Sequence, residues 1–382
     1  MSGLTTAAGA GAAALTGGPS GLTLGVEEEF HVIDPRTRRL VPRATEVLAA
    51  FPAGTTRVKP ELQDSVVEGN SAVCTDTTSL RVELVALRGE IVGAAEAAGL
   101  AVAAAGTVPL ADPKEITVSA DPRYRQMSED YQQLCREQLI CGVQTHVGLP
   151  DLELALAVAH RVTPWLPVLL AVSASSPFWL GSDTGYASWR SQVWRRWPTT
   201  GPLPPVGSID ALDALGAGLV ATGVVRDPGM LYWDIRLNRG VGTLEFRVGD
   251  ACPSVDLVVA LAALARGLVV TARAELLGGS PPEPPALPII EAGRWRASRS
   301  GLGGDLVHPL EGVPLPAGQV LDVLLAHVGP ALDAEGDTAA VTAALTTLRA
   351  AGGSADRQRV IARADGLPAV VDDLVAETAG RC

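Results

Sequence analysis

The sequence has few cysteines and no paired cysteine motif. Its five cysteines stand apart without a Cys-x-x-Cys spacing, which excludes a disulfide framework and a cysteine-based zinc site: Cys74, Cys135, Cys141, Cys252 and Cys382. This usage is typical of a protein in a reducing cytoplasm, where we expect it to reside. The net charge is −12 and the sequence has no basic stripe, which together exclude a nucleic-acid-binding protein. With 47% hydrophobic residues, a disordered chain is excluded as well.

Long uninterrupted apolar runs are also missing. The longest, within residues 255–272, is broken by Asp256, Arg266 and Gly267, which indicates a buried helix and no membrane span. Residues 1–20 have neither a basic start nor an apolar core, so we expect a disordered tail and not a signal peptide. A Gly/Pro-rich boundary at 279–282 could divide the rest, but the helices predicted beyond it need a partner surface. We therefore expect one catalytic domain over 21–382.

Several well-known catalytic and nucleotide-binding motifs are absent from the sequence. No GxxxxGK[ST] loop occurs, which excludes a P-loop nucleotidase, and no GxGxxG follows a strand pattern. The GxSxG and HExxH motifs are missing too, which argues against a serine hydrolase of that type and a zinc protease. Any nucleotide chemistry must therefore use a different arrangement of residues.

Hydrophobic periodicity predicts a mixture of strands and helices, and hence an α+β or α/β sheet with helices packed outside. A Pro-rich loop is predicted at 199–208. Strands are predicted at 22–33, 65–73, 100–108, 139–148, 231–237 and 243–249. Helices are predicted at 43–51, 79–98 with Ser79 as N-cap, 125–138, 151–161, 164–175, 254–276, 317–328, 337–351 and 355–378.

Three acids occur together in the first predicted strand, in the segment GVEEEF at residues 25–30. Because side chains alternate along a strand, Glu27 and Glu29 share one face, and Glu28 lies on the other with the apolar residues. Two carboxylates about 7 Å apart on one face repel each other unless a cation lies between them. Hard oxygen ligands of this kind suit Mg²⁺ or Mn²⁺. For Glu28, a paired structural acid is the better interpretation.

Other predicted strands also carry polar residues among apolar ones. Glu68 is an acid on a mostly apolar strand and needs a partner or a metal. Glu245 and Arg247 share a face, which taken alone is most simply explained by cross-strand ion pairs on a wet sheet face. Gln144 and His146 also share a face, although a lone strand histidine is more often structural. Together, strand glutamates and arginines suit metal-assisted phosphate chemistry.

These segments resemble the carboxylate–amine ligase family related to type 2 glutamate–cysteine ligases. The resemblance is carried, in the family's order, by GVEEEF at 25–30, VEGNSAVC at 67–74, CGVQTHVG at 141–148 and TLEFRVGD at 243–250, with a weaker WRASRSGL at 295–302. It covers about residues 22–375. It implies a curved antiparallel sheet with helices on its outer face and the active site on its concave face. It also implies ATP-dependent amide formation through an acyl-phosphate intermediate, and it suggests a homodimer.

The resemblance also implies roles for particular residues. The shell for Mg²⁺ or Mn²⁺ would comprise Glu27, Glu29, Glu68 and Glu245. Arg247 would contact the phosphate or the activated carboxylate, and His146 and Gln144 would line the site near the acyl-phosphate. Candidates for the ATP side are Arg296 and Arg299, together with Glu245. Candidates for a substrate carboxylate are Arg190 and Arg195.

The sequence departs from the family pattern at two positions. Gln144 stands where the family commonly has histidine, and Ser300 stands where an aromatic residue or histidine is usual. Gln144 can donate a hydrogen bond but cannot carry a charge, so substrate choice or activity can differ. Two alternatives stay open: a non-catalytic relative that binds a metabolite or nucleotide, and a metal-dependent phosphotransferase. The sequence does not identify the small-molecule acid and amine.

Overall fold

The computed structural model describes residues 19–279 and 283–381, so the predicted tail at 1–20 falls almost wholly outside the described residues. An eight-stranded antiparallel sheet forms the centre in the order β3-β4-β1-β6-β10-β9, with β2 and β5 also pairing with β1. Its strands are β1 Leu24–Asp34, β2 Arg39–Leu40, β3 Val58–Pro60, β4 Val66–Asn70, β5 Ala101–Ala103, β6 Gly142–Gly148, β9 Ile235–Asn238 and β10 Thr243–Asp250. Two small hairpins join β7 Phe178–Trp179 to β8 Ser182–Asp183 and β11 Asp305–Val307 to β12 Pro314–Pro316.

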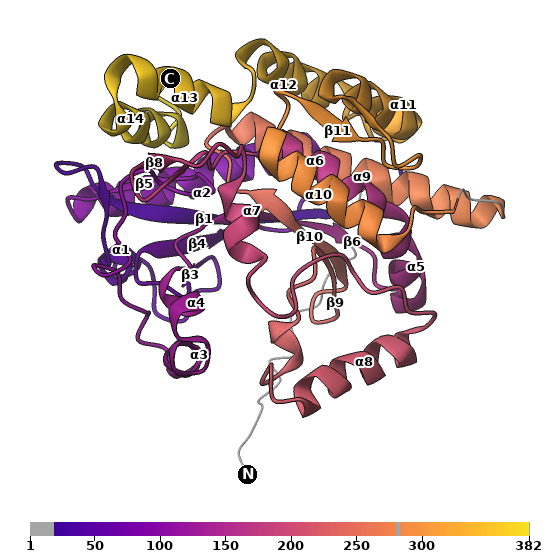
Figure 1. Ribbon diagram of the computed structural model, residues 1–382, viewed down its shortest axis with the longest axis horizontal. Helices are drawn as coiled ribbons and strands as arrows, with labels where there is room; N and C mark the ends of the chain where they lie inside the picture. The colour runs from indigo at the N-terminus through magenta and orange to yellow at the C-terminus, as the bar shows by residue number, and fades with distance from the viewer. Residues whose placement is uncertain (1–18, 280–282, 382) are drawn as a thin grey trace.

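Helices cover one face of this sheet. That face is contacted by α2 Thr77–Ala97, α6 Leu166–Ser173 and α9 Val255–Gly278. Figure 1 shows the C-terminal helices as a further layer beyond them, and α3, α4 and α8 on the opposite side of the sheet. The remaining helices are α1 Ala44–Leu48, α3 Pro122–Tyr131, α4 Gln133–Arg136, α5 Leu152–Val162, α7 Trp189–Trp194, α8 Ile209–Ala221, α10 Leu287–Ser300, α11 Ala317–Glu335, α12 Thr338–Ala351, α13 Ser354–Asp365 and α14 Leu367–Thr378. Short 3₁₀ turns lie at Thr163–Trp165 and Pro228–Met230. This arrangement confirms the predicted α+β architecture.

The helix boundaries differ from the predictions in ways that local chemistry explains. Asp76, and not Ser79, caps α2, because its carboxylate accepts a hydrogen bond from the Ser79 backbone N–H at 2.8 Å. The helix predicted at 355–378 divides at Gly366, whose φ of 83° ends α13 before a proline-containing first turn begins α14. Helices α8 and α10 were not predicted from the sequence.

Two helical stretches are long and apolar enough to cross a membrane by length and composition alone. They are Leu152–Ser173, which comprises α5 and α6, and α9. Within the protein, 83% and 78% of their most apolar windows are buried. Burial of this extent is what core helices show, since their apolar side chains pack against the sheet and the outer helices.

Strand register places the predicted functional residues on one face of the sheet. Residues directly opposite each other in antiparallel strands share a face, and Glu27 lies opposite Gln144 while Glu29 lies opposite Glu68. Glu245 lies opposite both His146 and Arg236. Apolar partners alternate with these pairs and face the helices, as Phe30 and Val67 do in the core beneath α2. The polar face therefore is the one turned away from α2, α6 and α9.

Glu28 lies on the helix-covered face and forms an ion pair with Arg88 of α2. The distance from Arg88 Nη2 to Glu28 Oε1 is 2.5 Å, and the two side chains are only 3% and 2% exposed. Arg88 also donates to the carbonyl oxygens of Cys252 and Pro253, just before α9. Glu28 is thus a paired structural acid, as predicted, and Arg88 joins β1, α2 and the start of α9.

Candidate active site

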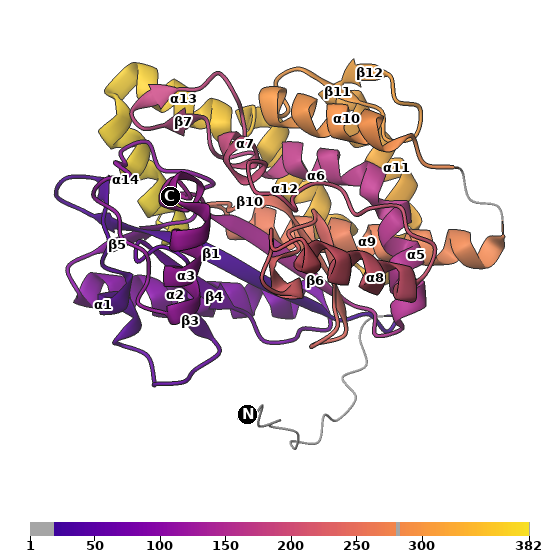
Figure 2. The same cartoon turned by 60° about the horizontal axis from the view of Figure 1, so that its bottom comes forward.

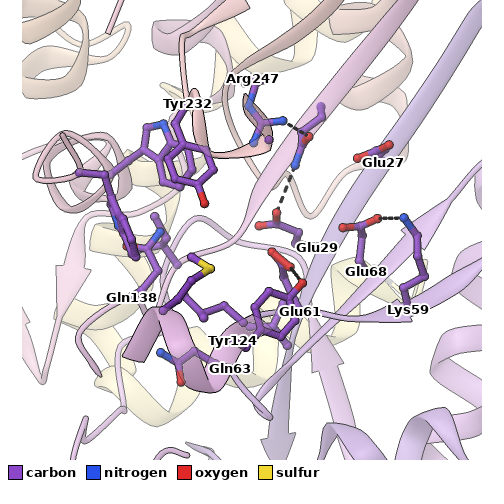
Figure 3. A pocket seen from close by; sticks show the side chains of 18 of the residues that line it. Glu27, Glu29, Lys59, Glu61, Gln63, Glu68, Tyr124, Gln138, Tyr232 and Arg247 are labelled. Carbon is purple, nitrogen blue, oxygen red and sulfur yellow. Dashed lines mark hydrogen bonds and ion pairs between the residues drawn. The ribbon is translucent and has the colours of Figure 1, made fainter. Parts of the chain in front are cut away.

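A cavity of about 390 Å³ lies on the polar face of the sheet, among the loops and short helices that border it. Six of the residues predicted for the site line it: Glu27, Glu29, Glu68, Gln144, Arg190 and Arg247. Figure 2 turns the sheet so that the side carrying α3 and α8 comes forward. Figure 3 shows the carboxylates of Glu27, Glu29, Glu61 and Glu68 gathered along one side of this cavity.

The acidic cluster is held by hydrogen bonds at its base. Glu29 accepts from the Gly142 backbone N–H at 2.6 Å and from the Gln144 side-chain amide at 3.3 Å. Burial raises the pKa of Glu29 to about 7, and burial together with the charges of Glu29 and Glu68 raises the pKa of Glu61 to about 8. Carboxylates that resist ionisation, because they are buried and lie close to one another, are a donor set that a divalent cation would satisfy. The residues present therefore fit Mg²⁺ or Mn²⁺.

A second group of ligand atoms lies beside this cluster. One atom each from Glu27, His146 and Glu245 lies within 4.8 Å of the others, an arrangement that could hold a metal ion. His146 Nε2 is 3.3 Å from Glu27 Oε1, and its Nδ1 is 2.9 Å from the Thr243 hydroxyl. Burial opposes ionisation of Glu27, but the hydrogen bond and charge of His146 outweigh it and hold the pKa of Glu27 below its usual value.

Glu245 is surrounded by cations of the protein itself. Arg236 approaches it at 2.8 Å, Arg247 contacts its other oxygen, and the Asn238 amide donates to it at 3.1 Å. Burial opposes ionisation, yet Arg247 and Arg236 outweigh it and bring the pKa of Glu245 to about 2. The cross-strand ion pair that the sequence suggested is present. Glu245 therefore orients two arginines, in addition to any metal contact.

Several residues that line the cavity were not predicted from the sequence. The sequence assigned no role to four of them: Lys59, Glu61, Tyr124 and Arg236. Lys59 Nζ lies 2.9 Å from Glu68, and the Tyr124 hydroxyl donates to Glu61 at 3.0 Å. The sequence did contain an indication for Arg236, because it lies on the charged face of the strand predicted at 231–237. Glu61 and Tyr124 lie outside any periodic strand pattern and gave no such signal.

Of the four other arginines predicted for the site, one lines the cavity and three do not. Arg190 is buried and donates to the backbone carbonyls of Val248 and Arg247. Three other arginines are not among the residues that line the cavity. Arg195 pairs with Glu291 at 2.9 Å, Arg299 contacts the Gly185 carbonyl, and Arg296 lies on α10 with Arg299. Roles for these three remain predictions.

Comparison with known proteins agrees with the geometry. The profile of glutamate–cysteine ligase family 2 (GCS2) matches residues 23–373. A protein of Mycolicibacterium smegmatis, provisionally named glutamate–cysteine ligase 2-2, is 48% identical over 359 residues, covering 94% of this chain and 90% of that protein. A Frankia casuarinae protein with the same provisional name is 47% identical over 94% of this chain, but the match covers only 41% of its own length. The chain thus spans less than half of that relative.

A solved structure shares the fold. The glutamate–cysteine ligase of Francisella tularensis, crystallised in complex with AMP, superposes with a TM-score of 0.71 over 94% of this chain and 88% of its own. At 12% identity this likeness concerns the fold alone. The family match over most of the chain and the identity of nearly one half with the M. smegmatis protein settle the assignment. The chain belongs to glutamate–cysteine ligase family 2.

Proposed function

We propose that the protein is an ATP-dependent carboxylate–amine ligase that forms an amide through an acyl-phosphate intermediate. The observation that carries this proposal is the joint presence of Glu27, Glu29, Glu61 and Glu68 with Arg247 in one cavity. Carboxylates that hold divalent cations, beside an arginine, are what a site needs to neutralise the phosphates of ATP without a P-loop. The family membership and the fold support the same reaction class.

In the first step, an oxygen of the substrate carboxylate attacks the γ-phosphorus of ATP, and ADP leaves. Glu27, Glu29, Glu61 and Glu68, and His146 beside Glu27, would hold Mg²⁺ or Mn²⁺. When bound, such ions shield the phosphate charge and act as Lewis acids. Arg247 is fixed by Glu245 and Gln144, so its guanidinium needs little reorganisation to face the transferred phosphoryl group.

In the second step, the amine nitrogen attacks the acyl carbon, phosphate leaves, and the nitrogen releases one proton to solvent, which forms the amide. Arg190 would contact the substrate carboxylate before this step, and Arg195 is a second candidate. Arg296 and Arg299 would lie on the nucleotide side, where their positive charge suits phosphate. The proposal also includes the location and the partners of the protein. It would act in the cytoplasm as a homodimer, on small-molecule acids and amines. Neither nucleic acid nor a membrane would take part.

The proposal is tested by a screen that pairs candidate carboxylates with candidate amines and measures ADP release with Mg²⁺, followed by mass spectrometry of the products. A ligase releases phosphate into solution and gives an amide. A phosphotransferase leaves the phosphate on the acceptor, which would overturn the proposal in favour of the alternative. A protein that binds ATP but releases no ADP with any pair would instead be a non-catalytic relative. The variant Glu68→Gln is the matched negative control for background ATPase.

A further inference from the structure

The active-site cavity has two chemically different ends. The acidic cluster, with Tyr124 beside Glu61, lies at one end, whereas the other end carries an aromatic wall formed by Trp194, Trp197 and Tyr232. Figure 3 shows Glu27 and Glu68 on one side of the cavity and Tyr232 and Gln138 on the other. Aromatic and apolar lining of this kind is what a binding site presents to the apolar part of a ligand.

The aromatic wall is tightly packed. The rings of Trp194 and Tyr232 lie 5.0 Å apart between centroids, and those of Trp197 and Tyr232 lie 5.8 Å apart. The Trp197 indole N–H donates to the Gln138 side chain at 2.7 Å, which fixes the ring in a buried position. Rings held in this way present a preformed apolar surface, and a ligand loses little entropy by ordering them.

Two arginines lie between the wall and the acidic cluster. The guanidinium carbons of Arg190 and Arg247 lie 5.9 and 6.0 Å from the centroid of the Trp194 ring. Both Nε atoms are buried without a hydrogen-bond partner, and so is the Trp194 indole nitrogen. The nearest carboxylate to Arg190 is Asp250, at 3.9 Å. Buried donors without acceptors are costly, so this position is suited to the carboxylate of a ligand.

The far end of the cavity offers little to a second negative charge. Of the cations that line the cavity, Arg123 already pairs with Asp227 at 2.6 Å. Tyr232 is sufficiently enclosed that burial raises its pKa to about 12. A substrate with a charged end group, such as glutamate, would have to lose hydration against aromatic rings there.

We infer that the carboxylate substrate of this site has an aromatic or bulky apolar body. Its carboxylate lies at Arg190 and Arg247, within reach of the acidic end, and its body packs against Trp194, Trp197 and Tyr232. This inference rests on the proposed ligase function, because it assumes that the carboxylate at the arginines is the one activated. It names a substrate class different from the glutamate in the family's name.

The test is a set of calorimetric titrations of the purified protein with Mg²⁺ and a non-hydrolysable ATP analogue. Phenylpropionate, glutarate and L-glutamate serve as ligands. We expect phenylpropionate to bind at least roughly 10-fold more tightly than either dicarboxylate, since one buried ring removes a large apolar area from water. Equal or tighter binding of glutarate or glutamate, or no measurable binding of phenylpropionate, overturns the inference.

Variants distinguish the contribution of the aromatic wall to binding from that of Arg190. Trp194→Ala should weaken phenylpropionate binding at least roughly 10-fold, and Arg190→Gln should weaken all three carboxylates. Trp295→Ala is the matched control, because Trp295 is 47% exposed and does not line the cavity. Tyr232→Arg should shift the preference towards glutarate, and it keeps the inference testable if Trp194→Ala does not fold. An unchanged preference in both wall variants overturns the inference.

The binding titrations and the ADP-release screen can fail independently. If phenylpropionate binds at the wall but no amine supports ADP release, the ligase proposal fails and the ligand class stands. If ADP release occurs with glutamate and amines while apolar acids neither bind nor react, the ligase proposal stands and the inference fails. Each result therefore decides between the two statements.

Discussion

Arg247 donates a hydrogen bond to the side-chain carbonyl of Gln144, with 2.8 Å between Nη1 and Oε1. The amide nitrogen of the same Gln144 donates to Glu29 at 3.3 Å. One neutral side chain therefore joins a cation to an acid of the cluster, with its carbonyl towards the arginine and its amide towards the carboxylate. Gln144 thereby supports the orientation of Arg247 without adding a charge.

Removal of this bridge should reduce catalysis more than stability. In Gln144→Ala, Arg247 keeps its contact with Glu245 but loses the partner that fixes its direction. Loss of a hydrogen bond to a charged group costs about 1–3 kcal/mol, so we expect kcat to fall roughly 10- to 100-fold. ADP-release kinetics measure the effect, and thermal melting shows whether the fold is kept. An unchanged kcat would mean that Glu245 alone orients Arg247.

Glu27 should be indispensable for metal-dependent chemistry. Glu27→Gln removes a negative charge from the group formed with His146 and Glu245, but it preserves size and hydrogen-bonding capacity. We expect the loss of ATP- and Mg²⁺-dependent amide formation and no change in the far-ultraviolet circular dichroism spectrum. Glu46→Gln is the control, since Glu46 pairs with Arg43 on the surface and does not line the cavity. Full activity of Glu27→Gln would refute the metal-site assignment.

The acidic cluster should make the metal-free protein less stable as pH rises. The pKa values of Glu29 and Glu61, about 7 and about 8, lie above the ordinary value of 4.5 that applies after unfolding. Between about pH 4.5 and 8 the folded state thus binds more protons than the unfolded state, and the free energy of unfolding falls as pH increases. Bound Mg²⁺ replaces these protons, so its stabilising effect should grow across the same window.

Melting temperatures at several pH values, with and without Mg²⁺, check this expectation. The double variant Glu29→Gln/Glu61→Gln serves as the reference, because the difference from wild type isolates these two groups from the other titrating residues. We expect wild type to lose stability relative to the variant as pH rises without Mg²⁺. A constant difference between the two proteins from about pH 5 to 8 would show that the two carboxyls titrate normally.

Alternation within single strands made part of the site predictable. The shared faces of Glu27 with Glu29, and of Gln144 with His146, follow from the two-residue period and were found in the cavity region. Glu61 could not be predicted in this way, because it follows Pro60 at the end of β3 and has no periodic neighbours. Its place beside Glu29 depends on the path of a connection between strands, which tertiary packing determines.

Features that depend on long-range packing were also missed in the fold. Helix α8 follows a Pro-rich loop, and α10 follows the Gly/Pro-rich segment, so composition around them favoured loops. The aromatic wall combines Trp194 from the end of α7 with Tyr232 from a loop before β9, 38 positions later by subtraction of the residue numbers. Neither residue has a local pattern that indicates a ligand surface, because only the folded arrangement brings the two rings together.

Arg88 should be a major contributor to stability, because it joins β1 to α2 and to the start of α9. Its guanidinium and the Glu28 carboxylate are almost completely buried, so Arg88→Ala leaves an acid without a partner in the core. Breaking a buried pair in this way costs roughly 3–5 kcal/mol. Urea unfolding followed by circular dichroism measures the change in the free energy of unfolding.

Arg81 provides a control on the same helix. It pairs with Asp256 at 2.7 Å, but the two side chains are 55% and 61% exposed, so water screens the pair. Arg81→Ala should therefore change the free energy of unfolding by less than about 1 kcal/mol. Because Glu28 lies between Glu27 and Glu29 on β1, Arg88→Ala should also weaken Mn²⁺ binding, whereas Arg81→Ala should not. Equal losses of stability in the two variants would show that the buried pair of Arg88 with Glu28 contributes no more than an exposed pair.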